Sequence, residues 1–184
     1  RPVTASGQPE ELHLWLLRHA KAMPEPPSGG DDHERRLAPS GRRDAAALGL
    51  RLRAGDLVPG DAAGPELALA SSAARTAETA GEVAAALGIA VDLRHRLYYG
   101  SPDDVLAELR TLDDGVRAVM VVGHNPATHE LACELLARED RSGRAQLRSF
   151  PTCAVARFAT GVARWRDLSY GSAVLVGFAR PPYD

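Results

Sequence analysis

Two histidines stand directly after apolar segments whose pattern predicts buried strands. His19 follows residues 14–17 and Arg18, and His124 follows residues 118–122 by one glycine. A neutral imidazole can attack phosphorus through one ring nitrogen, while a guanidinium binds phosphate oxygens through its planar fork of donors. These residue types, in these positions, favour phosphoryl chemistry.

A third apolar segment, residues 67–70, leads into Ser71 and, four residues later, Arg75. Arg75 falls at the start of a predicted helix, where a cation opposes the helix dipole. A nearby anion would offset that conflict, and bound phosphate is the natural candidate. Ligands of open α/β sheets bind beyond the carboxyl ends of the strands, which is where His19, Arg75 and His124 are all expected.

The elements that must position these side chains alternate along the chain. Helices are predicted over 40–54 with Ser40 as N-cap, over 75–87 closed by Gly88, from Ser101, and after Asn125-Pro126. Strands are predicted over 14–17, 67–70, 89–93, 118–122, 153–158 and 173–178. The polar or Pro- and Gly-rich segments 23–32, 55–65 and 138–149 are predicted loops, and the first of them either gates or borders the site.

This alternation predicts an α/β fold of three layers, with helices on both faces of a mainly parallel sheet. The length of 184 residues and the hydrophobic content of 45% suit one globular domain. We expect a flexible arm over residues 1–11 and a single domain over residues 12–184.

Five short motifs resemble those of the histidine phosphatase (phosphoglycerate-mutase-like) superfamily. Arg18-His19-Ala20 is similar to its Arg-His-Gly signature, with Ala20 where much of the family has Gly. Residues 71–80 resemble Ser-x-x-x-Arg-Thr-x-x-Thr-Ala, and residues 122–126 resemble the second-histidine motif. Residues 32–41, similar to Asp-x-Asp-Arg-Pro-Leu-x-x-x-Gly, and the late segment 175–178 point to the branch of SixA-like phosphohistidine phosphatases.

The resemblance spans residues 13–181 and implies a phosphoglycerate-mutase-like fold and a phosphohistidine intermediate. By this likeness His19 is the nucleophile, and His124 lies opposite it and contacts a phosphoryl oxygen. Arg18 and Arg75 would clamp the phosphate, and Arg35 would reach the same pocket, although Arg36 replaces the usual Pro.

A general acid is missing where mutase-like members carry a Glu, because residues 96–101 contain no carboxylate. An alkoxide leaving group needs a proton, whereas the imidazole of phosphohistidine has a conjugate-acid pKa of only about 6.5. The absence therefore favours protein phosphohistidine as the substrate, with proton relay by Tyr98 or Ser101 left open.

The composition argues against several other classes of protein. A net charge of −2 argues against a nucleic-acid binder, and no apolar stretch approaches the ~20 residues that span a bilayer. Cys133 and Cys153 are expected to be core thiols in a reducing compartment, which favours the cytoplasm, rather than a disulfide or a nucleophile. The chain starts at Arg1, so a removed leader stays open.

The remaining histidines give no metal-ligand spacing, so we expect no metal and no cofactor. His129 is expected on a surface or wall, and no role is assigned to His13, His33 or His95. Two alternatives to a phosphohistidine phosphatase stay open: a phosphatase of small phosphate monoesters, and a catalytically silent module that binds phosphate or a phosphoprotein. The partner is thus a phosphorylated protein or a small phosphorylated substrate, and the oligomeric state is open.

Overall fold

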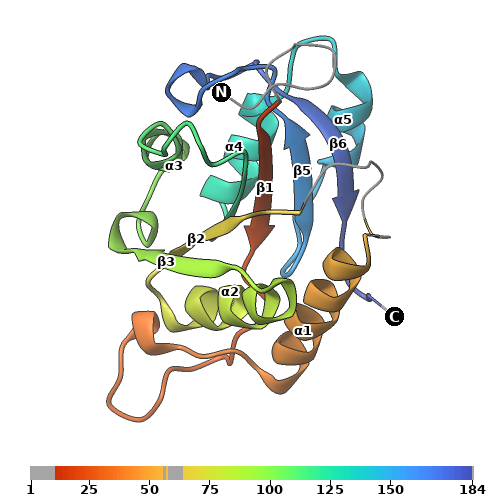
Figure 1. Ribbon diagram of the computed structural model, residues 1–184. Coiled ribbons are helices and arrows are strands. Elements are labelled where there is room, and N and C mark those ends of the chain that lie inside the picture. The colour runs from red at the N-terminus through yellow and green to blue at the C-terminus, as the bar shows by residue number, and fades with distance from the viewer. Residues whose placement is uncertain (1–10, 56, 58–63, 184) are drawn as a thin grey trace.

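One sheet of six strands organises the molecule, in the order β3-β2-β4-β1-β5-β6 (Figure 1). The computed structural model describes residues 11–55, 57 and 64–183. The expected arm, except Glu11, and most of the segment 55–65 lie outside the described residues. The strands are β1 (His13–Arg18), β2 (Leu67–Ser71), β3 (Ala90–Arg94), β4 (Ala118–Gly123), β5 (Val155–Ala159) and β6 (Val174–Ala179).

The strands of the site run in one direction. β1 pairs with β4, and β2 pairs with both β4 and β3, all in parallel. Only β5 runs the other way, antiparallel to both β1 and β6. The prediction of a mainly parallel sheet is therefore confirmed, and the carboxyl ends of β1, β2 and β4 meet at one edge.

Helices cover both faces of this sheet, as expected for a three-layer fold (Figure 1). They are α1 (Pro39–Ala54), α2 (Ala74–Leu87), α3 (Pro102–Leu109), α4 (Ala127–Leu135) and α5 (Arg141–Gln146), with short 3-10 turns η1 (Asp32–Glu34), η2 (His95–Leu97) and η3 (Trp165–Asp167).

Alternate residues of each strand pack on opposite layers. In β1, Leu14 and Leu16 join the cluster beneath α3 and α4, whereas Trp15 and Leu17 join the cluster beneath α1 and α2. β4 divides its residues in the same way. Since burying one leucine side chain stabilises a fold by roughly 1.5–3 kcal/mol, a strand buried on both sides is held firmly in register.

Local capping chemistry explains several helix boundaries. Ser101 accepts a hydrogen bond from the amide of Asp104, whose carboxylate accepts one from the amide of Ser101, and Pro102 begins α3 as expected. Gly88 ends α2 in the left-handed conformation, with φ of 72°. The prediction that Ser40 caps α1 is wrong: the helix begins one residue earlier, because Pro39, with its fixed φ, occupies the first turn after Ala38.

The prediction of a loop over 138–149 is also wrong, because this segment contains α5. The carboxylate of Asp140 accepts hydrogen bonds from the amides of Gly143 and Leu175, which cap this helix and tie it to β6. Leu147 and Phe150 are buried next to it. These long-range contacts stabilise a polar segment that has no helical periodicity of its own.

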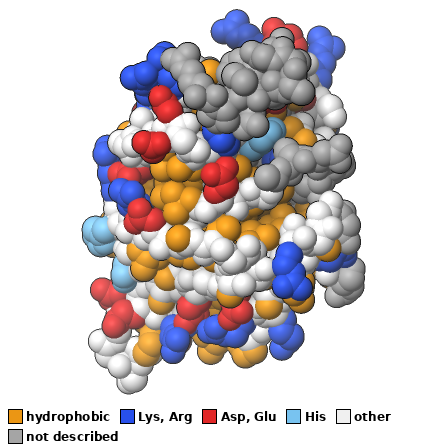
Figure 2. Space-filling model, viewed as in Figure 1, with side chains coloured by type: hydrophobic (Ala, Val, Ile, Leu, Met, Phe, Trp, Pro, Cys, Tyr) orange, Lys and Arg blue, Asp and Glu red, His pale blue; other side chains and the backbone are white. Residues whose placement is uncertain are grey.

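The segment that precedes α1 is joined to α2 by charged groups. The carboxylate of Glu78 accepts a hydrogen bond from the amide of Leu37 at 2.8 Å and pairs with Arg36 and Arg42. Acidic and basic side chains alternate along the lower edge of the face seen in Figure 2, where Figure 1 shows this segment and the two helices. These contacts keep η1 close to the carboxyl edge of the sheet.

Candidate active site

The two predicted histidines lie side by side at the carboxyl edge of the sheet. Arg18 of β1 is paired with Gly123 of β4, so the residues that come next, His19 and His124, are brought together by strand register. Their ring centroids are 5.2 Å apart. Residues more than 100 positions apart in sequence thus become neighbours because two parallel strands pair.

His19 is held in one orientation and one protonation state. Only 9% of its surface is exposed, and its Nδ1 atom lies 2.8 Å from the carbonyl oxygen of Ala20. Burial lowers its pKa to about 4, and the charges of Arg75 and Arg18 act in the same direction. At neutral pH the ring is therefore uncharged, donates from Nδ1, and keeps a lone pair on Nε2.

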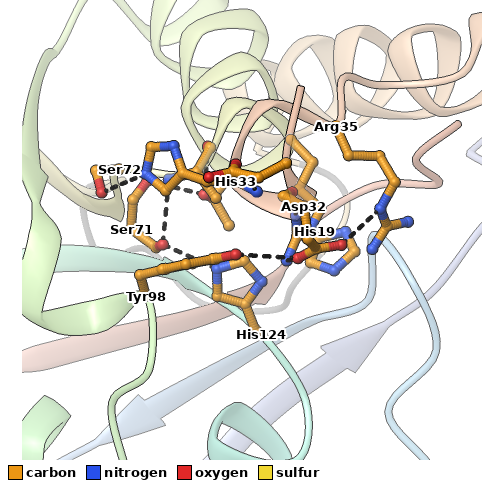
Figure 3. Close-up of polar contacts among 12 residues, drawn as sticks. His19, Asp32, His33, Arg35, Ser71, Ser72, Tyr98 and His124 are labelled. Carbon is orange, nitrogen blue, oxygen red and sulfur yellow. Dashed lines mark hydrogen bonds and ion pairs between the residues drawn. The ribbon is translucent and has the colours of Figure 1, made fainter. Parts of the chain in front are cut away.

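His124 is uncharged for similar reasons. Burial, together with His19 and Arg75, lowers its pKa to about 3. Its Nε2 atom is hydrogen-bonded to the hydroxyl of Ser71 at 2.8 Å, while its Nδ1 atom is buried without a partner. In Figure 3 the ring lies between Ser71 and His19. One nitrogen of this ring therefore has no hydrogen-bond partner in the free protein.

The three predicted arginines line the same open cavity of about 520 Å³ as both histidines. Arg75 is 6% exposed, and the Nη1 atom of Arg18 donates to the carbonyl of Phe150 at 2.9 Å. Arg35 donates to the carbonyl of Met23 at 3.1 Å. The structure therefore brings together the two histidines and three arginines that the sequence predicted. Of the two candidate proton relays, Tyr98 lines the cavity and Ser101 does not.

The cavity also contains a carboxylate that the sequence reasoning missed. Asp32 receives hydrogen bonds from Arg75, Arg35 and Tyr98, at 3.0, 2.9 and 3.1 Å (Figure 3). The segment 96–101 does lack an acid, but the inference that the site lacks one is wrong. A sequence signal existed, because Asp32 opens the motif from which only Arg35 was taken.

Asp32 is ionised in this arrangement. Burial by itself would raise its pKa, yet the hydrogen bond from Arg35, the charge of Arg75 and the hydrogen bond from Tyr98 outweigh it and leave the pKa below its ordinary value. The anion expected near the cationic first turn of α2 is therefore this carboxylate. In the conformation described, it accepts protons in hydrogen bonds and has none to give.

Two histidines without an expected role support the position of Asp32. The Nε2 atom of His33 lies 2.9 Å from the hydroxyl of Ser72, which is 3.1 Å from Nδ1 of His95. The ring of His33 also meets that of Tyr98 edge-on, with centroids 4.8 Å apart. This cluster joins η1 to the ends of β2 and β3.

Three further predicted residues, one histidine and two cysteines, lie outside the cavity. His129 is half-buried outside the cavity lining, and its Nε2 atom lies 2.7 Å from the carbonyl oxygen of Leu147. Cys153 is buried, Cys133 is half-buried, and both are free thiols. Burial raises the pKa of Cys153 to about 12, so this thiol is protonated and unreactive as a nucleophile.

The described part of the chain shows neither a metal cluster nor a membrane-spanning helix. Within residues 11–55, 57 and 64–183, no three His, Cys, Asp or Glu side chains are grouped as a metal ion requires. None of the helices in those ranges is long and apolar enough to cross a membrane.

Comparisons with known proteins agree with this fold. The chain matches a protein from Nakamurella multipartitia that is provisionally named the phosphohistidine phosphatase SixA, with 30% identity, a TM-score of 0.78, and coverage of 92% of this chain and 96% of that chain. A protein of the same provisional name from Agrobacterium tumefaciens gives 27% identity, a TM-score of 0.74, and coverage of 94% and 99%.

Sequence comparison leads to the same class. The profile of the histidine phosphatase superfamily (branch 1) matches residues 14–98. An uncharacterized protein of Mycobacterium tuberculosis, Rv1276c, is 36% identical over 170 residues, which cover 90% of this chain and 99% of that protein. A phosphoglycerate-mutase-like sheet with a cavity at its carboxyl edge, lined by two histidines and three arginines, defines the class. The chain belongs to the histidine phosphatase superfamily, in its SixA-like branch.

Proposed function

We propose that this protein is a phosphatase that removes the phosphoryl group of protein phosphohistidine through a phosphorylated His19. The observation that carries the proposal is the pair of uncharged imidazoles, 5.2 Å apart, beside the donors of Arg18 and Arg75. A tetrahedral dianion bound in the cavity beside both rings would meet cations on its oxygens and a lone pair directed at phosphorus.

In the first step, Nε2 of His19 forms a bond to phosphorus and the bond to the leaving group breaks. The carbonyl of Ala20 keeps the proton on Nδ1, so the phosphorylated ring is a hydrogen-bonded cation. Arg18, Arg75 and Arg35 would stabilise the charge on the transferred oxygens, and His124 would contact one of them. Water then attacks phosphorus and releases His19 as a neutral imidazole.

Two observations support a phosphoramidate as substrate. The P–N bond of phosphohistidine needs less acid assistance than an ester bond, and residues 96–101 lack the acid that mutase-like members carry there. Both structural relatives at 27–30% identity carry the name phosphohistidine phosphatase. A monoester of a small molecule is the second candidate, because a protonated Asp32 would also serve its more basic leaving oxygen.

Trapping the intermediate tests the nucleophile. Brief incubation with a phosphohistidine peptide labelled on phosphorus, followed by denaturation in alkali, should leave label on the peptide that contains His19. His19→Ala should remove both the label and the turnover. A matched control is His129→Gln, which changes a histidine away from the cavity and should retain both.

A substrate panel tests the specificity. The phosphohistidine peptide should be hydrolysed with a kcat/KM at least about tenfold above that of sugar phosphates, since only its P–N bond breaks without strong acid assistance. A preference for the sugar phosphates would favour the second candidate. Phosphate binding without turnover of any substrate would instead identify a silent binding module.

We also propose a cytoplasmic location, supported by the two free thiols, one of them buried. Reducing conditions keep such thiols unpaired.

A further inference from the structure

Asp32 occupies the donors that a bound phosphoryl group would need. Both Nη atoms of Arg75 are engaged by this residue, Nη1 by its carbonyl oxygen at 2.7 Å and Nη2 by its carboxylate at 3.0 Å. The Nε atom of Arg35 donates to the other carboxylate oxygen at 2.9 Å. Two of the three arginines proposed to clamp phosphate are therefore already bound to one internal anion.

From this competition we infer that Asp32 is the proton donor of the reaction, and that substrate binding itself loads it with the proton. The inference rests on the proposed function, because it assigns a role in that reaction. A dianionic phosphoryl group that takes the donors of Arg75 and Arg35 leaves the carboxylate beside a second anion. A carboxylate that loses its cations and gains an anionic neighbour binds a proton more tightly.

The surroundings of Asp32 allow this exchange. Its side chain is 56% exposed, so a proton can arrive from solvent, whereas Arg75 is nearly buried and stays in place. η1 contains three residues, and His33, Ser72 and His95 hold it against the sheet. The carboxylate can therefore change partners without displacement of its backbone.

The charged and titratable groups that face Asp32 come from four parts of the fold. Arg35 follows it on the same segment, Arg75 lies on α2, Tyr98 follows η2, and His124 follows β4. Burial, together with hydrogen bonds to Tyr99 and Asp32, raises the pKa of Tyr98 to about 12, so its hydroxyl remains a donor. The two arginines supply the positive charge, and substrate competes for both of them.

The chemistry balances over the two steps. As Nε2 of His19 bonds to phosphorus, the bond from phosphorus to the leaving imidazole breaks, and that imidazole leaves neutral with the proton from Asp32. In the second step a water oxygen bonds to phosphorus, its proton passes to the Asp32 carboxylate, and the bond between His19 and phosphorus breaks. Asp32 is then protonated again, and it loses this proton when phosphate departs.

Proton uptake on anion binding tests the first half of the inference without any turnover. Titration calorimetry with tungstate at pH 7, in buffers of different ionisation enthalpy, measures the protons taken up per bound tetrahedral dianion. The native protein should take up part of a proton, and Asp32→Asn should take up markedly less. Asp31→Asn is the matched control, because it removes one negative charge from the preceding residue and keeps the oxygen that accepts from the amide of His33. It should behave as the native protein does.

Uptake that is unchanged in Asp32→Asn would assign the proton to His19 or His124 and overturn the inference. Absence of uptake in the native protein would overturn it as well.

The second half is tested by leaving-group basicity. Phenyl phosphate needs a proton on its leaving oxygen more than p-nitrophenyl phosphate does. Asp32→Asn should therefore lower kcat by about 10²-fold on phenyl phosphate and by less than about tenfold on p-nitrophenyl phosphate. Equal losses on the two esters would overturn the role as donor. If the native protein turns over no substrate, the proposed function fails, while the tungstate titration still decides whether Asp32 takes up the proton.

Discussion

The hydroxyl of Thr79 links the two halves of the candidate site. It accepts a hydrogen bond from the backbone amide of Ala20 at 3.0 Å and donates one to the carbonyl of Arg75 at 2.6 Å. The residue after His19 is thereby tied to α2, the helix that carries Arg75. Thr79 is fully buried, so water cannot replace its hydroxyl as the hydrogen-bond partner of Ala20 and Arg75.

Removal of this hydroxyl should destabilise the fold and disturb the site. Thr79→Val keeps the shape of the side chain but leaves the amide of Ala20 buried without a partner, which costs about 1–3 kcal/mol. The free energy of unfolding, measured by urea denaturation, should fall by that amount, and kcat should fall with it. Thr79→Ser retains the hydroxyl and should lose much less of either.

Close approach of two backbones makes Gly41 a second sensitive position. A Cβ atom at Gly41 would lie 2.1 Å from the carbonyl oxygen of Lys21, a backbone atom that cannot rotate away. Gly41→Ala should therefore cost at least about 1–3 kcal/mol, the usual penalty of overpacking. The matched control is Gly81→Ala on α2, where a Cβ meets nothing within 4 Å. That change should stabilise the helix by about 0.5–1 kcal/mol in the same denaturation experiment.

The planar fork of Arg75 should matter more than its charge. Its two Nη atoms contact two different oxygens of Asp32, and in the proposed complex they would contact phosphate. Arg75→Lys keeps the charge but not the paired donors, so we expect tungstate to bind at least about tenfold more weakly. Arg43→Lys, an exposed position on α1, should leave binding unchanged. Equal affinity of the native protein and Arg75→Lys would remove Arg75 from the clamp.

The low pKa of His19 predicts an unusual acid limit for activity. Because the neutral ring is the nucleophile in the proposed reaction, kcat/KM, corrected for ionisation of the substrate, should not decline as pH falls from 7. Proton uptake by Asp32 would raise it over this range, and the decline should come only near pH 4. A histidine with an ordinary pKa would give a decline near pH 6.5. A decline of kcat/KM near pH 6.5 would contradict the role of His19 as the nucleophile.

The low pKa of His19 also makes the folded chain less stable as pH falls. The unfolded chain protonates His19 near pH 6.5, whereas the folded chain resists protonation down to about pH 4. Stability is thus complete above pH 6.5 and is lost as pH falls toward 4, by an amount on the order of 3 kcal/mol for this residue. His19→Gln should lose less stability than the native protein between pH 7 and pH 4.5, as measured by urea denaturation at each pH.

The sequence by itself determined the alternation of strands and helices and the location of the residues predicted to bind phosphate. Buried strands are marked by apolar runs, and helix ends by residues such as Ser101 and Gly88, because these signals act within a few positions of the chain. His19, His124 and Arg75 were predictable because parallel strands bring the residues after their carboxyl ends to one edge of the sheet.

Only the tertiary structure decided what lies opposite that edge. Asp32 reaches the cavity beside Tyr98 because His33 holds η1 against the end of β2, and no local pattern encodes that packing. The helix after Asp140 forms for a similar reason, since its cap also binds an amide of β6. Contacts between residues distant in sequence depend on the packing of the whole chain. The helix after Asp140 and the pairing of Asp32 with two arginines therefore became visible only in three dimensions, although Asp32 itself stands in a recognisable motif.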